Sequence, residues 1–162
     1  MPRILQLLVQ GEYISHSTES TLRNCSCEAD SWSVAEIDFM KRFALAYFVK
    51  QFEGYGSAAD AQDVLVMFHL AGLDVTLLLD YWREYMDTPM AWWGAVNLID
   101  SCDDAGCYRH LFSDATLPDL ITNWLGRTDT REAIRTAFLR NRDNEMPAWY
   151  SEKMFDRFLD VK

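Results

Sequence analysis

Four cysteines and one histidine have the only spacing in the chain that resembles a metal site. They form two close pairs, and the histidine follows the second pair: Cys25, Cys27, Cys102, Cys107 and His110. Thiolate and imidazole are ligands that zinc prefers, but neither gap is the common two-residue spacing. A chain of 162 residues can also fold without disulfides. We therefore expect free, reduced thiols and no metal or cofactor, with zinc and a disulfide as the alternatives.

The remaining residues suited to catalysis do not form a recognisable constellation. His16 lies in a Ser/Thr-rich stretch, where adjacent residues cannot converge as a nucleophile, base and acid must. His69 shares a helical face with Leu65 and Phe68, which favours a hydrogen-bonded core histidine. The sequence contains no glycine-rich phosphate loop, no nucleophile elbow and no paired-histidine zinc motif. We therefore expect a protein that is not an enzyme.

Acidic side chains are concentrated in the middle of the chain. The formal net charge is −10, and residues 1–27 and 105–162 are each neutral. The whole excess therefore lies in residues 28–104, where fourteen acidic residues accompany four basic ones. The negative electrostatic potential of this segment repels phosphate groups, so we expect no direct binding of nucleic acid. The segment is either a solvated surface or an acidic face that docks onto a basic partner.

A stripe of arginines is expected near the C-terminus. At about 100° per residue, Arg131, Arg135 and Arg142 fall on one side of a helix together with Phe138. Arg127 lies just upstream on the same side. Cations one helical turn apart repel each other, so the stripe requires anions nearby. It either pairs with the acidic segment of the protein itself or holds a phosphate or an acidic partner.

The elements that carry these residues are predicted to be helices throughout. Ser33 and Glu36 form a capping box that begins a long helix near residues 34–53. Further helices are predicted at 57–72, 74–86, 89–100, 118–126, 128–140 and 147–159. Gly72 should end the first of these, Asp74 should cap the second, and Pro118 should lead the fourth. We find no sustained alternation typical of strands. The prediction is an all-α, compact, single-domain bundle of about six to eight short helices around the long one. Residues 1–30 are expected to be irregular or weakly structured, with a strand or a helix over residues 3–14 as the alternatives.

Aromatic residues in the helix after Pro89 divide into two groups. Trp92, Val96 and Ile99 share an inward face, whereas Trp93 falls on the opposite flank. Trp93 is therefore either covered by another helix or an exposed anchor for a partner.

No stretch of the chain is suited to crossing a membrane. The apolar residues 4–9 are too short for a signal-peptide core, and no run reaches about 18 apolar residues without a charge. We expect a soluble, cytoplasmic protein that does not bind membranes.

These features favour a non-enzymatic acidic inhibitor that blocks a basic, nucleic-acid-handling protein. It would be a bacterial toxin immunity protein or a phage-encoded inhibitor of a defence complex, such as an anti-CRISPR protein. The residues expected to contact the partner are Asp80, Glu84, Asp87, Trp93, Asp100, Asp103 and Asp104. The alternative is a helical adaptor or regulatory subunit that binds a peptide, or its own copy as a homodimer, through an aromatic groove.

Overall fold

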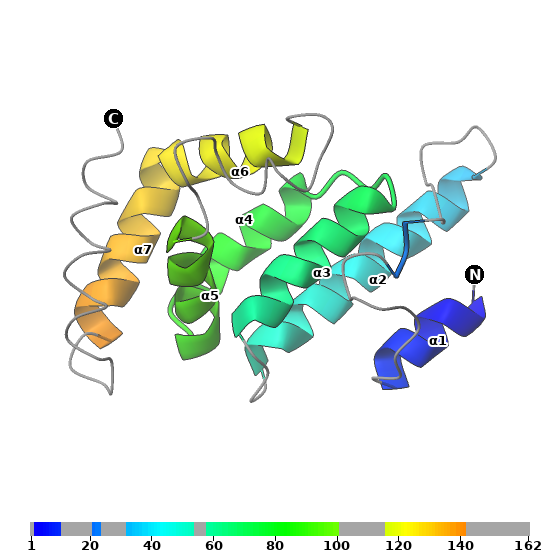
Figure 1. Cartoon of the computed structure of the whole chain (residues 1–162), viewed down its shortest axis with the longest axis horizontal. Helices are drawn as coiled ribbons and strands as arrows, with labels where there is room; N and C mark the ends of the chain where they lie inside the picture. The colour runs from blue at the N-terminus through cyan, green and yellow to red at the C-terminus, as the bar shows by residue number, and fades with distance from the viewer. Residues whose placement is uncertain (1, 11–20, 24–31, 54–57, 101–115, 142–162) are drawn as a thin grey trace. The chain divides into compact units, whose positions relative to one another are not determined.

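All the regular structure that we describe is helical (Figure 1). The computed structural model describes residues 2–10, 21–23, 32–53, 58–100 and 116–141. Its helices are α1 (Pro2–Gln10), α2 (Val34–Glu53), α3 (Ala58–Leu70), α4 (Thr76–Glu84), α5 (Pro89–Asp100), α6 (Thr116–Gly126) and α7 (Thr128–Asn141). The predicted all-α class is confirmed, and so is the long helix. The helix predicted at 147–159 lies outside the described residues.

The chain divides into two compact units, which we call unit 1 (Met1–Leu78) and unit 2 (Leu79–Lys162). The boundary falls within α4, whose first residues belong to unit 1 and whose remainder belongs to unit 2. Among the described residues, no helix in either unit is long and apolar enough to cross a membrane.

In unit 1, α2 begins at the predicted capping box. The Ser33 amide donates to Glu36 Oε2 at 2.8 Å, and the Glu36 amide donates to Ser33 Oγ at 3.3 Å. The bond from the Ser33 side chain lowers the pKa of Glu36 below its ordinary value, because it stabilises the carboxylate. The helix then buries Met40, Ala44 and Phe48 in the core of the unit, and it packs beside α3 (Figure 1).

The connection from α3 to α4 is fixed at both ends by local hydrogen bonds. Gly72 has φ 77°, which other residues rarely adopt, and its amide donates to the His69 carbonyl at 2.8 Å. The Leu73 amide donates to the Phe68 carbonyl at 3.0 Å, which completes a Schellman motif. Asp74 then caps α4 by accepting from the Thr76 amide at 3.0 Å. The predicted end of α3 at Gly72 and the cap at Asp74 are therefore both present.

The first residues of the chain differ from the prediction of an irregular segment over residues 1–30. Pro2–Gln10 form α1, an amphipathic helix that buries Leu5 and Leu8. These leucines are three residues apart and therefore share one face, so the pattern of this short apolar run is helical.

Unit 2 is built around tryptophans. Trp82 is fully buried, its ring centroid lies 5.7 Å from that of Trp124, and its indole N–H donates to the Ala91 carbonyl at 2.8 Å. Trp92 packs against Phe138 of α7 at 6.3 Å, and α7 also contacts α6. The inward face predicted for α5 is confirmed, because Trp92, Ala95, Val96 and Ile99 are buried. α6 begins at Thr116, two residues before the Pro118 expected to lead it.

Candidate functional site

A hollow among the described residues of unit 2 lies beside α7. Its first wall is formed by the end of α4 and the turn that follows it. The turn is held by the Tyr85 carbonyl, which accepts from both the Thr88 amide at 2.8 Å and the Thr88 hydroxyl at 2.9 Å. Met86 is buried beneath this turn, whereas Glu84 and Asp87 are exposed. Because the backbone is fixed, the two carboxylates are held on the surface of the unit.

The second wall is one face of α7. This face consists of Asp129, Glu132, Ala133, Thr136 and Arg140. The last four follow Asp129 by three, four, seven and eleven residues, which is the spacing of a single helical face. With Arg83, Glu84, Met86 and Asp87 they line an open groove of about 370 Å³, which we call the α7 groove. Its described charged residues are four acidic and two basic side chains, so the groove is acidic.

A cluster of ion pairs closes one end of the α7 groove. Arg127 binds Asp129 through two parallel bonds, Nε–Oδ1 at 3.1 Å and Nη2–Oδ2 at 2.9 Å, and also binds Asp80 at 2.9 Å. Arg83 contacts Asp129 as well, and lies 3.8 Å from Asp80. The Arg127 guanidinium lowers the pKa of Asp129, and Asp129 in turn raises the pKa of Arg127.

A second ion pair lies at the other end. Arg140 Nη1 is 2.6 Å from Asp87 Oδ1, and both side chains are largely exposed. Between the two ends, Glu84 and Glu132 are exposed on opposite walls. Within the described part of the chain, neither of these two carboxylates has an ion pair or a hydrogen bond. The groove therefore has two carboxylates whose charge is not compensated by a neighbour among the residues described.

The structure brings together three of the residues expected to contact a partner. Glu84 and Asp87 line the α7 groove, and Asp80 belongs to the ion-pair cluster of Arg83 and Arg127. Asp80 and Asp87 are already engaged by arginines of unit 2. Trp93 lies on α5, is half-buried and packs against Trp92 at 6.2 Å. Asp100 ends α5 with its side chain outside the described residues, where Asp103 and Asp104 also lie. Their role in binding stays a prediction.

The arginine stripe is only partly visible. Arg131 is half-buried and Arg135 is exposed on α7, whereas Arg142 lies outside the described residues. Two described arginines of this region pair with the acidic segment: Arg127 binds Asp80, and Arg140 binds Asp87. Pairing between the two parts of the sequence is therefore present. It involves Arg127, predicted just upstream on the side of the stripe, and Arg140, which lies between Arg135 and Arg142 in the sequence.

Sequence reasoning missed the acidic contribution of α7. Asp129 and Glu132 lie in a part of the chain whose net charge is zero, so they were not selected as site residues. A usable signal was available, because the spacing of Asp129, Glu132, Thr136 and Arg140 defines one polar helix face.

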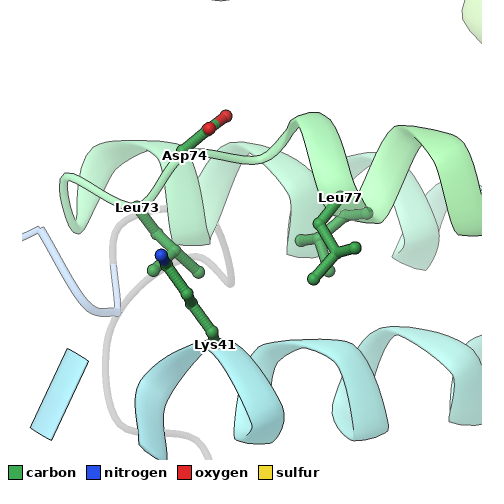
Figure 2. A pocket seen from close by; sticks show the side chains of 5 residues that line it. Lys41, Leu73, Asp74 and Leu77 are labelled. Carbon is green, nitrogen blue, oxygen red and sulfur yellow. The ribbon is translucent and has the colours of Figure 1, made fainter. Parts of the chain in front are cut away.

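A smaller hollow lies in unit 1 (Figure 2). It has a volume of about 110 Å³ and is lined by Lys41, Leu73, Asp74, Leu77 and Leu78. Lys41 rises from α2 toward Leu73, while Leu77 points from α4 toward α2 and the Asp74 carboxylate points away (Figure 2). Bonds from Thr76 lower the pKa of Asp74, with a smaller effect of Lys41. Asp74 is thus occupied as a helix cap.

No group of three or more histidine, cysteine or acidic side chains is placed to hold a metal ion among the residues that the structure describes. The four cysteines lie outside those residues, so their expected free state stays a prediction. No family model, curated protein or solved structure matches the chain.

Proposed function

We propose that this protein is a non-enzymatic inhibitor that receives a basic segment of a nucleic-acid-handling protein in the α7 groove. The observation that carries the proposal is the pair of exposed carboxylates, Glu84 from α4 and Glu132 from α7, that line the same open groove. A lysine or arginine of a partner would complete the pairing that these two residues lack within the described chain.

The ion pairs at the two ends of the groove support this function by fixing its walls. Arg83 and Arg127 hold the start of α7 against the end of α4 within unit 2. Binding sites with walls held in place lose less conformational entropy on association. Glu84 and Glu132 would then meet a partner with little rearrangement of the backbone.

Electrostatics explains why such a groove suits an inhibitor. Nuclease sites and nucleic-acid channels are basic, so carboxylates placed where phosphates would lie are attracted to them and accelerate encounter. A toxin immunity protein and a phage-encoded inhibitor of a defence complex would both act in this way. We place the function in the cytoplasm, where such partners act and where cysteines stay reduced.

The test compares proteins captured from the native host by three forms of the full chain. These are the wild type, the groove variant Glu84→Lys/Glu132→Lys and the control Asp38→Lys/Glu53→Lys, which makes the same charge change on exposed residues of α2. We expect one basic protein to be retained by the wild type and the control and to be lost by the groove variant. Equal retention by all three forms would refute the proposal.

The kinetics and the effect on the captured protein complete the test. Its association rate with the wild type should fall steeply as ionic strength rises through the physiological range. The bound inhibitor should also prevent that protein from binding nucleic acid. A rate that does not respond to salt, or a complex that still binds nucleic acid, would contradict an electrostatic inhibitor.

A further inference from the structure

One face of α2 in unit 1 exposes aromatic side chains that the α7 groove does not explain. Phe39, Phe43 and Tyr47 are spaced four residues apart and stack along the helix, with ring centroids 6.4 Å and 5.8 Å apart. Phe39 is 53% exposed, and Phe43 and Tyr47 are half-buried. We call these three residues the aromatic row. Phe39 is one of five large apolar residues that are exposed among the described residues, and the other two rings of the row lie directly beside it.

The aromatic row is supported from inside the unit. Phe68 of α3 is fully buried and meets both Phe43 and Tyr47 edge-on, at 6.3 Å in each case. Edge-to-face contacts of this kind fix the orientation of aromatic rings. Phe43 and Tyr47 are therefore supported by Phe68, while Phe39, the most exposed ring of the row, stacks on Phe43.

Charges of opposite sign lie at the two ends of the aromatic row. Glu36 precedes it, Lys50 follows it, and both are exposed. At about 100° per residue, these two residues and the three rings fall within about 80° of one another around α2. Glu36 Oε2 is used by the capping box, which leaves its second carboxylate oxygen available for a further bond.

The order of these residues is symmetric about Phe43. Glu36 and Lys50 are each seven residues from Phe43, and Phe39 and Tyr47 are each four residues from it. A two-fold axis through Phe43 that relates two antiparallel helices would therefore place acid opposite base and ring opposite ring. Self-complementarity of this kind is what an isologous dimer interface requires.

We propose that a second copy of this chain packs antiparallel against this face of α2. Glu36 then pairs with Lys50 of the partner subunit, Phe39 meets Tyr47 of the partner subunit, and the two Phe43 rings meet on the axis. The two ion pairs are about 21 Å apart along the helix, from a rise of about 1.5 Å per residue. A single pair of helices forms a small interface, so we expect a weak, concentration-dependent dimer. This surface lies in unit 1 and does not depend on the function proposed for the α7 groove.

Sedimentation equilibrium of the full chain, up to about 1 mM protein, tests the dimer directly. We expect the average mass to rise toward that of two chains as concentration rises. Phe39→Ser should abolish the rise, while Leu139→Ser should preserve it, because it removes an apolar residue of similar exposure from α7. A wild-type chain that stays monomeric throughout, or equal effects of the two substitutions, would overturn the proposal.

Charge reversal tests the antiparallel pairing. Lys50→Glu and Glu36→Lys each make both ion pairs repulsive, so each variant alone should associate about tenfold more weakly, since two exposed pairs change sign. A mixture of the two variants restores acid opposite base at both ends and should dimerise as strongly as the wild type. Arg135→Glu on α7 makes the same charge change as Lys50→Glu and should have no effect. Failure of the mixture to recover would refute this arrangement of the helices.

Discussion

Unit 1 and unit 2 each carry a net charge of −5, from ten acidic and five basic residues in the first and from fifteen and ten in the second. In unit 2, arginines join α4 to α7 and leave Glu84 and Glu132 uncompensated within the described chain. In unit 1, Glu36 completes the capping box of α2, Asp74 caps α4, and Asp38 and Glu53 are exposed on α2. An exposed apolar feature of that unit is the aromatic row. Equal net charge thus accompanies two different kinds of surface.

This difference teaches that charge along the sequence is a poor guide to charge in space. The sequence divides between an acidic segment ending at residue 104 and a neutral remainder. Within unit 2 that division disappears, because Asp80 and Asp87 of the first part bind Arg127 and Arg140 of the second. What a partner meets is the set of charges left after such internal pairing.

The largest expected effect compares the cores of the two units. Phe48→Ala in unit 1 and Trp82→Ala in unit 2 each remove a fully buried ring, and each should lower the free energy of unfolding by about 3–5 kcal/mol. Urea unfolding should be followed by far-ultraviolet circular dichroism and by tryptophan fluorescence. Fluorescence reports mainly on unit 2, since Trp32 alone among six tryptophans lies in unit 1.

The same experiment tests the prediction of a single domain. One domain requires the two signals to give one coincident transition in the wild type and in both variants. Separate transitions, with Phe48→Ala shifting only the dichroism and Trp82→Ala only the fluorescence, would show two domains.

A smaller effect is expected at the cap of α2. Ser33→Ala removes the hydroxyl that accepts from the Glu36 amide and should lower the free energy of unfolding by about 1 kcal/mol. Ser33→Asp retains an acceptor at the same position and is the control. Thermal melts of the two variants should differ, and equal melting temperatures would show that the bond contributes nothing measurable.

The smallest effect is a pH dependence that distinguishes the units. The pKa of Asp129 is lowered mainly by its bonds to Arg127, so its contribution to stability is present above the ordinary carboxyl pKa. That contribution is lost as pH falls through the lowered value in the folded state. Melting temperatures of the wild type and Asp129→Asn should therefore differ most near neutral pH and converge in acid.

Salt and a neighbouring acid provide the controls for this pH effect. Glu132→Gln removes a charge from the same helix without removing an ion pair among the described residues, so at neutral pH it should lower the melting temperature less than Asp129→Asn does. Added salt should reduce the Asp129 effect, because ion pairs are screened. The lowered pKa values of Glu36 and Asp74 arise mainly from neutral hydrogen-bond donors and should respond less. If added salt did not change the difference in melting temperature between the wild type and Asp129→Asn, the ion pair between Asp129 and Arg127 could not be its cause.

Much of the helical structure was predictable because its signals are local. Ser33 and Glu36 begin α2, Gly72 ends the turn after α3, and Asp74 caps α4, each through bonds to residues nearby in the chain. α1 was missed because Pro2–Gln10 is a short apolar run, for which helix and strand patterns are hard to distinguish.

The candidate site was only partly predictable because it depends on distant pairing. Glu84 and Asp87 were selected from the acidic segment, but the wall formed by Asp129 and Glu132 was not. The bond between Arg127 and Asp80 joins residues 47 positions apart, and no pattern within one helix specifies it. The ion pairs at the two ends of the α7 groove therefore depend on packing between segments that are distant in the sequence.

The short connection between α3 and α4 also determines where this protein will accept added sequence. Gly72 closes one helix and Asp74 opens the next, while Leu73 and Val75 on either side of Asp74 are buried. One inserted residue would break a cap or move a buried side chain to the surface. An epitope tag or a circular permutation placed there would therefore fail, and the connection marks a length constraint for any engineered form of the chain.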